Sequence, residues 1–291
     1  MRDNEKRLGA PSGPAKQSDA APVAQAAAPA AQSQGLSFVV PTDFVELPSQ
    51  GKFYSADHPL HNQEVVEIKH MTAKEEDILT SASLLKKGLA LERLLSSILL
   101  DKNIKPETLL SGDRNAILIA ARQSGYGSMY ETRVACPQCT AVSKHAFDLD
   151  EKQISHGCLD KDMLVETKAR LQDNVLYVTL PKTNVVAGMR LLTGKDENKL
   201  SELGKKRKAK NEESSVTDQL SRIIVSLNEV TDAFEIHRFV ESMPIIDSKY
   251  LRTVYGKLVP NVDLAQGFGC IECGHYDNME VPFNTEFFWP G

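Results

Sequence analysis

The chain has 291 residues, with 34 lysines and arginines against 39 aspartates and glutamates, and a net charge of −5. Its 41% hydrophobic content suffices for one core or two small ones, and the net acidity excludes a generally basic nucleic-acid-binding coat. No apolar run approaches the roughly 18 residues of a membrane span, and no signal peptide opens the chain. We therefore expect a soluble protein of a reducing cytosol, where five cysteines indicate metal or redox chemistry rather than disulfides.

The beginning of the chain is of low complexity. Ala, Pro, Gln and Ser dominate residues 9–35, and this composition buries too little apolar surface to offset the entropy of ordering. We predict a disordered Ala/Pro-rich tail over residues 1–36. The alternative is a docking arm that becomes ordered on a partner.

A first lobe of strands and helices is predicted over residues 37–150. Its predicted strands have short β-branched alternation and lie at 65–70, 130–134 and 142–149. Its predicted helices have apolar side chains at helical spacing and lie at 72–88, 90–100 and 113–125. The first helix begins at a capping box, Thr72-Ala-Lys-Glu75, and the third is predicted to have Asp113 as its N-cap.

A second lobe is predicted over residues 175–291, after a polar connector at 151–174. Its predicted strands lie at 175–180 and 279–283. Its predicted helices lie at 186–192, 215–227, 233–243 and 247–258, the last with Asp247 as N-cap. The basic run Lys205–Lys208 falls between two of these helices, and we interpret it as a solvated loop because no aromatic side chains are interleaved with it.

The two lobes can be aligned with each other. Residues 113–139 align without a gap on residues 247–273, 134 positions later. Further upstream the resemblance is weaker, and it pairs 93–100 with 222–229 and 78–80 with 191–193. We interpret this as an internal duplication, with a coincidence of helical patterning as the alternative. The predicted fold class is α+β, mainly helical, with two similar lobes that each end in a Cys-x-x-Cys hairpin.

Two Cys-x-x-Cys motifs are the strongest chemical signal in the sequence. Each lies between two predicted strands, so both thiolates of a pair face one side of a hairpin turn. Two such pairs complete a tetrahedral four-sulfur zinc site, although the separation of the pairs is unusually long. We predict one structural zinc ion per chain, joining the two hairpins as a zinc ribbon, with the ligands Cys136, Cys139, Cys270 and Cys273. The alternative is two independent redox or chance pairs.

A catalytic role for this zinc is not expected. Catalytic zinc usually has three protein ligands and an open position, whereas four thiolates would close the shell. Other possible ligands lie nearby in the sequence, but none replaces a cysteine in the predicted set; they are His145, His156, Cys158 and His275. Because no nucleophile, base and orienting group form a recognisable motif either, we predict a protein that is not an enzyme and has no small-molecule substrate.

Aromatic residues near both ends of the predicted lobes are candidates for partner binding. Left exposed, they would form an apolar patch typical of an interaction site. The alternative is that those at the C-terminus pack into the core beside the second hairpin. The candidates are Phe53, Tyr54, Phe287, Phe288 and Trp289.

Several short stretches together resemble a viral family. They are Leu47-Pro-Ser-Gln-Gly-Lys-Phe-Tyr54, Met71-Thr-Ala-Lys-Glu-Glu-Asp-Ile-Leu79, Asp113-Arg-Asn-Ala-Ile117, Gly125-Tyr-Gly127, Cys136-Pro-Gln-Cys139, Leu191-Leu-Thr-Gly194 and Phe287-Phe-Trp-Pro290. In this order they are similar to the baseplate hub assembly proteins of contractile-tailed, T-even-like bacteriophages, over about residues 40–290. The resemblance implies a non-enzymatic protein that helps to build the central hub of the baseplate in the bacterial host cytoplasm, and that either stays in the virion or leaves after assembly.

Two classes of function follow from these observations. The first is a tail assembly protein that binds other baseplate hub or tail proteins and contacts neither a membrane nor nucleic acid. The second is a zinc-ribbon nucleic-acid-binding or transcription-associated factor. The net charge favours the first class, because affinity for nucleic acid depends on a basic face that neutralises phosphates.

Overall fold

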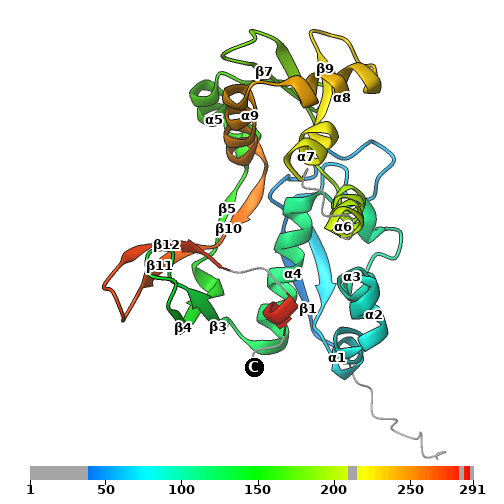
Figure 1. Ribbon diagram of the computed structural model, residues 1–291. Coiled ribbons are helices and arrows are strands. Elements are labelled where there is room, and N and C mark those ends of the chain that lie inside the picture. Colours follow the sequence, from blue (N-terminus) through cyan, green and yellow to red (C-terminus); the bar gives the residue numbers. More distant parts are fainter. Residues whose placement is uncertain (1–38, 209–214, 282–284, 289–291) are drawn as a thin grey trace, which may run out of the picture. The chain divides into compact units, whose positions relative to one another are not determined.

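The structure, a computed structural model, describes residues 39–208, 215–281 and 285–288 (Figure 1). The predicted tail, residues 1–36, lies outside the described residues, as does Trp289. Helices alternate with small antiparallel sheets, so the α+β class is confirmed. Four of the five sheets have two strands, and the fifth has the order β6-β7-β8-β9 among the described residues.

The first half of the described chain begins with a hairpin and ends with another. The strands are β1 (Thr42–Glu46), β2 (Val65–Lys69), β3 (Met129–Ala135) and β4 (Val142–Asp148). The helices between the hairpins are α1 (Ala73–Thr80), α2 (Ala82–Lys87), α3 (Ala90–Ile98), the 3-10 turn η1 (Pro106–Thr108) and α4 (Ser111–Tyr126). The capping box at the start of α1 is confirmed, as are strands β3 and β4 on either side of the first cysteine pair.

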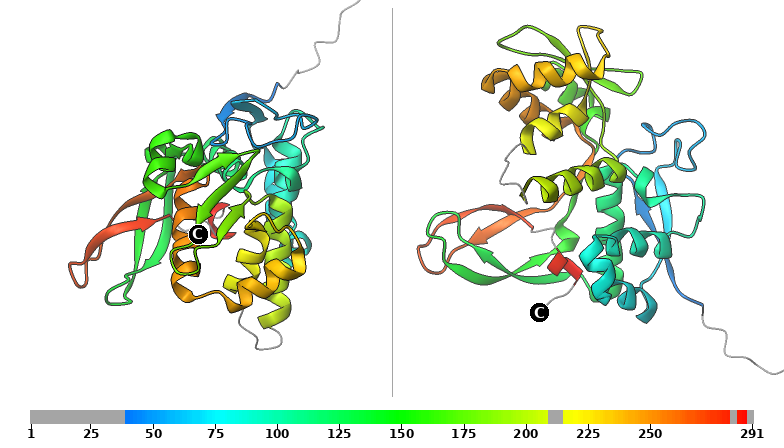
Figure 2. Two further views of the ribbon diagram at one scale, coloured as in Figure 1. Left: turned by 90° about the horizontal axis from the view of Figure 1, so that it is seen from above. Right: turned by 45° about the vertical axis from the view of Figure 1, so that its right-hand side comes forward.

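The second half follows a similar order of elements with additional strands, and Figure 2 shows two further views of the chain. Its strands are β7 (Val175–Thr179), β8 (Val186–Met189), β9 (Ile224–Leu227), β10 (Asn261–Asp263), β11 (Ala265–Gly269) and β12 (Tyr276–Glu280). Its helices are α6 (Gly194–Lys208), α7 (Ser215–Ile223), α8 (Ala233–Ser242) and α9 (Ile245–Leu258), followed by the 3-10 turn η4 (Thr285–Phe288).

The segment that composition predicts to be a polar connector, residues 151–174, contains regular structure. Its elements are the 3-10 turn η2 (Leu149–Glu151), β5 (Gln153–Ser155), the 3-10 turn η3 (Gly157–Leu159), α5 (Lys161–Thr167) and β6 (Arg170–Gln172). Strand β5 pairs with β10, and β6 pairs with β7. Both strands are only three residues long, so their alternation of polar and apolar residues is too short to stand out from a loop.

Three predictions of secondary structure are wrong. The segment predicted as a helix at 186–192 contains strand β8, which pairs with β7 and β9, and residues 224–227 of another predicted helix form β9. A short apolar run fits a buried strand and a helix equally well, and here the pairing of neighbouring strands decides. The basic run predicted as a loop is instead the end of helix α6.

The predicted N-caps are also wrong, and the reason is informative. Asp113 lies in the first turn of α4, whose N-cap is Leu110. Its buried carboxylate accepts hydrogen bonds from the Ser49 N–H at 3.0 Å, the Ser49 hydroxyl at 2.6 Å and the Tyr54 hydroxyl at 2.8 Å. Asp113 therefore joins the long helix to the loop that follows β1.

The second half contains an equivalent buried aspartate that binds a preceding loop. Asp247 lies in the first turn of α9, after the N-cap Pro244, and accepts hydrogen bonds from the backbone N–H groups of Lys182 at 2.7 Å and Thr183 at 3.0 Å. These two residues follow Leu180-Pro181 at the end of β7, just as Ser49 follows a Leu-Pro pair at the end of β1. Burial raises the pKa of Asp113 against the opposing effect of its hydrogen bonds from Ser49 and Tyr54.

A second pair of equivalent interactions lies at the start of the first helix in each half. Thr72 donates its backbone N–H to Glu75, which also binds the Lys69 ammonium at 2.6 Å. In the second half, 121 positions later, Thr193 donates to Asp196, which pairs with Arg190 through two bonds of 2.8 Å. Thus Thr193 corresponds to Thr72, and the sequence pairing of 191–193 with 78–80 is wrong.

The other upstream pairing is also out of register. Helix α7 has the same length as α3 and lies 125 positions after it, not the 129 positions that pairing residues 93–100 with 222–229 implies. The contacts of the residues that follow the two helices support the offset of 125 positions. Leu99 forms a β-bridge with Ile68 of β2, and Ile224 pairs with Met189 of β8. The equivalent residues therefore differ in side chain while they keep their place in the sheet.

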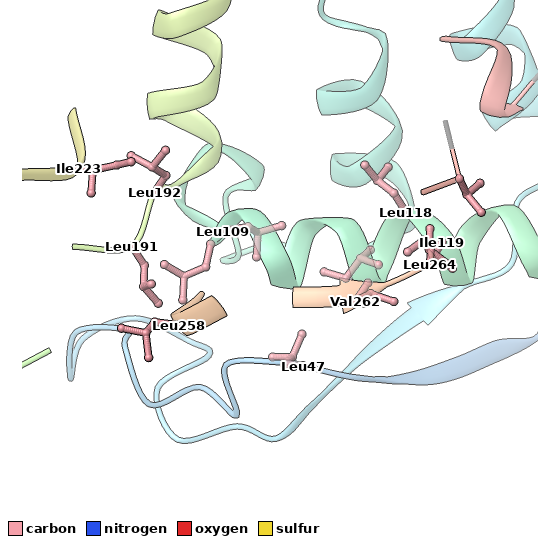
Figure 3. Packing of buried hydrophobic residues seen from close by; sticks show 14 of the residues in the cluster. Leu47, Leu109, Leu118, Ile119, Leu191, Leu192, Ile223, Leu258, Val262 and Leu264 are labelled. Carbon is pink, nitrogen blue, oxygen red and sulfur yellow. The ribbon is translucent and has the colours of Figure 1, made fainter. Parts of the chain in front are cut away.

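The core is continuous across both halves. Figure 3 shows Val262 and Leu264 beside the helix that carries Leu118 and Ile119, and all four are buried. Glycine permits a close backbone approach here: a Cβ on Gly112 would lie 1.9 Å from the Pro260 carbonyl oxygen. The segment between α9 and β10 thus packs directly onto the start of α4.

The pH dependence of the unfolding free energy tests the interaction between Lys69 and Glu75. Burial alone would raise the pKa of Glu75, but hydrogen bonds from Lys69, Ser97 and Thr72 lower it to about 2, against an ordinary value of about 4.5. A carboxyl whose pKa falls on folding stabilises the fold above its unfolded pKa, and this contribution is lost as the pH falls through the folded pKa. We expect Glu75→Gln to lower the free energy of unfolding at neutral pH, with a difference from wild type that shrinks towards pH 2. Urea unfolding across this range measures it, and exposed Glu76→Gln should show no such trend.

Candidate metal centre

The two cysteine pairs lie in turns of nearly identical construction. In the β3–β4 turn the Cys136 N–H donates to the Ala141 carbonyl at 2.9 Å, and the Thr140 N–H donates to the Cys136 carbonyl at 2.9 Å. In the β11–β12 turn the same two bonds join Cys270 to His275 at 2.8 Å and Gly274 to Cys270 at 3.0 Å. Thr140 and Gly274 both have left-handed backbones, with φ of 60° and 70°. Each turn therefore presents its two thiols on one side.

The structure brings all four predicted ligands together. The Sγ atoms of Cys136 and Cys273 are 3.7 Å apart, as are those of Cys139 and Cys270, and all four lie within 4.8 Å of one another. A tetrahedral ion with Zn–S bonds near 2.3 Å has sulfur atoms about 3.8 Å apart. A disulfide would bring two sulfur atoms to about 2.05 Å. The spacing fits four ligands of one ion and no disulfide.

The environment of the thiols favours metal binding at one position in particular. Backbone N–H groups of Cys273 and Glu272 lower the pKa of the Cys270 thiol to about 7, which favours the thiolate that a metal requires. The Ala141 N–H also favours the Cys139 thiolate, but the nearby sulfur atoms outweigh it and raise the pKa of Cys139 to about 12. Four neighbouring thiolates repel one another, and a divalent cation would remove this repulsion.

The hairpins are held side by side by their own side chains. The His145 ring of β4 packs edge-on against Phe268 of β11, with ring centroids 5.4 Å apart. Gln266 of β11 donates its side-chain amide to the Asp148 carbonyl at 2.6 Å and accepts from the Asp148 N–H at 3.0 Å. The four sulfur atoms are therefore positioned by two hairpins that already pack together (Figure 1).

The pairing of the sulfur atoms is reciprocal. Cys136 and Cys270 are equivalent under the 134-residue repeat, and so are Cys139 and Cys273. The first cysteine of each half lies next to the second cysteine of the other half. Reciprocal contacts of this kind are what a two-fold relation between like units produces. Each half thus supplies half of the site.

The other residues considered from sequence do not join the cluster. His145 packs on Phe147 and Phe268, His156 bonds the Pro48 carbonyl at 2.9 Å, and His275 lies 3.9 Å from Asp277. Cys158 is buried elsewhere, and burial raises its pKa to about 12. Within the described residues, the four cysteines are the one group of three or more potential ligands with donor atoms this close.

Most of the aromatic candidates for partner binding are buried. Tyr54 is buried with its hydroxyl on Asp113, and Phe53 is half-buried against the core. Phe287 and Phe288 are fully buried, and Phe287 meets the Tyr130 ring edge-on at 5.2 Å. The expectation of an exposed aromatic patch is therefore wrong for Tyr54, Phe287 and Phe288, whereas the alternative of packing into the core describes the last two.

A buried arginine that the sequence analysis did not single out holds the C-terminal segment. The Arg122 guanidinium donates to the carbonyl groups of Phe287 at 2.9 Å and Gly127 at 3.0 Å, and it lies 5.0 Å above the Tyr126 ring. Burial lowers the pKa of Arg122. The carbonyl groups and the aromatic ring that contact the guanidinium group compensate its charge. In the sequence, the signal for this buried arginine is that it is a single charged residue directly after an apolar run within a predicted helix.

Truncating Phe287 should reveal this role. We expect Phe287→Ala to lower the free energy of unfolding by about 3–5 kcal/mol, because it leaves a cavity between Tyr130, Phe288 and Arg122. Chemical denaturation measures the loss. The matched control is Phe234→Ala, since Phe234 is exposed on α8, and its effect should stay within about 0.5 kcal/mol. An equal effect of the two variants would contradict a packing role for Phe287.

Comparisons with known proteins identify one family. Among the described residues, no helix is both long and apolar enough to cross a membrane. No curated protein matches the chain, and no solved structure matches it. A family model described as T4 bacteriophage base plate protein matches residues 40–289, which include both hairpins and all four cysteines. The chain therefore belongs to the T4 bacteriophage base plate protein family.

Proposed function

We propose that this chain is a non-enzymatic assembly and structural protein of the phage baseplate hub, in which one zinc ion joins the two halves. The family supports a structural role in the baseplate. The observation that supports the zinc is the set of four sulfur atoms at tetrahedral spacing, drawn equally from two hairpins 134 residues apart. Other hub and tail proteins are its partners, in the host cytoplasm during assembly and in the virion if it stays.

The proposed zinc is structural because its shell is complete. Four thiolates leave no coordination position for a substrate or an activated water. The buried carboxylates outside the site are likewise occupied: Asp113 binds the loop after β1, and Asp247 binds the loop after β7. These groups act as ties between elements, which suits a protein whose task is to present surfaces.

Metal content tests the site directly. Elemental analysis of protein purified without added metal should find about one zinc per chain. Cys273→Ser should lose it, whereas Cys158→Ala should keep it, since Cys158 is buried outside the cluster. Protein that contains no zinc and has four titratable thiols at these positions would contradict the proposal.

Co-expression tests the role in assembly. The tagged chain should co-purify with at least one hub subunit of the same phage and not with the tail sheath. Mass spectrometry of purified particles then decides between a permanent component and a transient chaperone. Salt-dependent retention on heparin or DNA, without capture of any hub subunit, would favour the nucleic-acid-binding alternative.

A further inference from the structure

Strand β1 has a free edge. It pairs with β2, and the His70 N–H donates to the Pro41 carbonyl at 2.9 Å. In an antiparallel pair this bond places the odd-numbered residues of β1 towards β2. The N–H and C=O groups that point to the opposite edge belong to Thr42, Phe44 and Glu46. No described strand pairs with that edge, and no described residue hydrogen-bonds these groups.

The equivalent edge in the second half is covered. Strand β7 corresponds to β1, since each precedes a Leu-Pro pair whose following residues bind the buried aspartate. Strand β6 pairs with β7 on the edge away from β8. It reaches that edge through a two-residue turn, Asp173-Asn174, with φ of 51° and 62°. Positive φ at both residues is typical of the tight type I′ hairpin.

The first half cannot make this turn. The residues equivalent to Asp173-Asn174 are Val40-Pro41, and proline holds φ near −65°. Val39 and Val40 accordingly have no regular structure. The place that β6 occupies beside β7 therefore has no counterpart beside β1 among the described strands.

A groove lies along this free edge. One side is β1, from Asp43 to Glu46, and the floor is formed by Ala116 and Ala120 of α4 together with Ile154 and Val262. The small alanine side chains leave room for the side chains of an added strand. Beyond the ends of the two strands, the His156 ring that follows β5 bonds the Pro48 carbonyl that follows β1, at 2.9 Å.

The chemistry of the groove indicates what it accepts. Three carboxylates line it against a single ammonium group; they are Asp43, Glu46 and Asp150, against Lys152. Two of them also lie near imidazole rings, Asp43 at 2.8 Å from His70 and Glu46 at 3.7 Å from His156. On the outer face of the hairpin Phe44 is 71% exposed and Val65 is 46% exposed. Exposed edges are usually blocked by lysine, proline or a bulge, and β1 contains none of these.

We propose that the free edge of β1 is a docking site for an extended segment of another baseplate protein, with alternating apolar and basic residues, which adds as a strand where β6 lies in the second half. Its apolar side chains would pack on the α4 floor, and its basic side chains would meet the carboxylates. Strand addition of this kind gains affinity from main-chain hydrogen bonds and specificity from alternate side chains. The identity of the partner as a baseplate protein rests on the proposed function.

Two other occupants fit less well. The preceding tail is dominated by Ala, Pro, Gln and Ser and contains few β-branched residues, so it is a poor source of a strand. Nucleic acid would bring phosphates towards three carboxylates, which disfavours it electrostatically.

The probe is a capped synthetic peptide of about seven alternating Lys and Val residues, long enough to span β1. Amide exchange of the isotope-labelled full chain is followed by NMR. At about 1 mM peptide, we expect exchange at the Phe44 and Glu46 amides to slow at least about tenfold. A peptide of alternating Glu and Val should protect them less. Absence of protection by either peptide would overturn the inference.

Two variants locate the effect. Glu46→Pro removes one N–H that faces the groove and no bond to β2, so it should abolish protection of Phe44, whereas Glu46→Gln keeps the N–H and should weaken protection only modestly. If Glu46→Pro does not fold, Ala120→Lys places an ammonium on the groove floor and should also abolish binding. Protection that persists in both variants would contradict the site.

The same variants separate this inference from the proposed function. A hub subunit that co-purifies with wild type but is lost with Ala120→Lys supports both. A hub subunit that co-purifies equally with Ala120→Lys, with no protection of the Phe44 amide, overturns the docking site and leaves the proposed function intact. Peptide protection without any hub partner supports the docking site and contradicts the proposed function.

Discussion

Cys136→Ser is expected to abolish zinc binding and to lower the melting temperature by about 10 °C or more. In zinc-finger peptides, metal binding contributes about 10–16 kcal/mol of folding free energy, and in a domain of this size 1 kcal/mol shifts the melting temperature by about 2–4 °C. We expect the variant to lose only part of that free energy, because the hairpins also pack through His145 and Phe268. Even this part is enough for a large effect on the melting temperature. Elemental analysis and calorimetry of one preparation measure both quantities.

The site offers matched controls for this experiment. Cys270→Ser, the equivalent position in the other half, should have a similar effect, because each half supplies two ligands. Cys158→Ala should retain the metal. A strong chelator added to wild type should reproduce the loss of stability. Loss of zinc with an unchanged melting temperature would show that packing alone joins the halves.

Asp113→Ala is the second substitution with a large expected effect, about 3–5 kcal/mol of unfolding free energy. It leaves the N–H and hydroxyl of Ser49 and the hydroxyl of Tyr54 without their carboxylate acceptor in a buried site, and unsatisfied buried donors cost about 1–3 kcal/mol each before relaxation. Urea unfolding measures the change. Tyr54→Phe should cost less, because the carboxylate keeps both bonds from Ser49 and the one buried group left without its acceptor is the Leu110 N–H, which donates to the Tyr54 hydroxyl at 3.0 Å.

The exposed helical carboxylate Asp77 provides the control. Asp77→Ala should change the unfolding free energy by no more than about 0.5 kcal/mol. Asp247→Ala should resemble Asp113→Ala, because it frees two backbone N–H groups at residues 182 and 183. If Asp113→Ala behaved like Asp77→Ala, the carboxylate would not be the tie between α4 and the first hairpin.

Much of the local structure could be predicted from the sequence where a single local rule applies. The Thr72–Glu75 capping box begins α1, and apolar spacing identifies α3 and α9. The spacing of the cysteine pairs predicts the halves of one site, and the structure brings their sulfur atoms together. Tetrahedral thiolate ligation needs particular side chains at particular spacings, so it leaves a strong pattern in the sequence.

The errors occurred where distant contacts decide. Residues 186–189 form a strand because β7 and β9 lie on either side of them. Asp113 has the composition of a helix cap, yet its carboxylate serves a loop more than 50 residues earlier, in Ser49 and Tyr54. The C-terminal aromatics are buried because Arg122 and Tyr130 provide a site for Phe287.

The sequence alone therefore predicts the proximity of the four cysteines, the family resemblance and those elements whose signal lies within one helix turn or one hairpin. Tertiary contacts alone set the register of the repeat, because Leu99 after α3 and Ile224 after α7 occupy equivalent positions beside β2 and β8. The tertiary structure also decides which edges are covered: β6 pairs with β7 on the edge away from β8, whereas no described strand pairs with the edge of β1 that faces away from β2. The physical reason is that backbone hydrogen bonds and burial depend on neighbours distant in the chain, which local side-chain patterns do not specify.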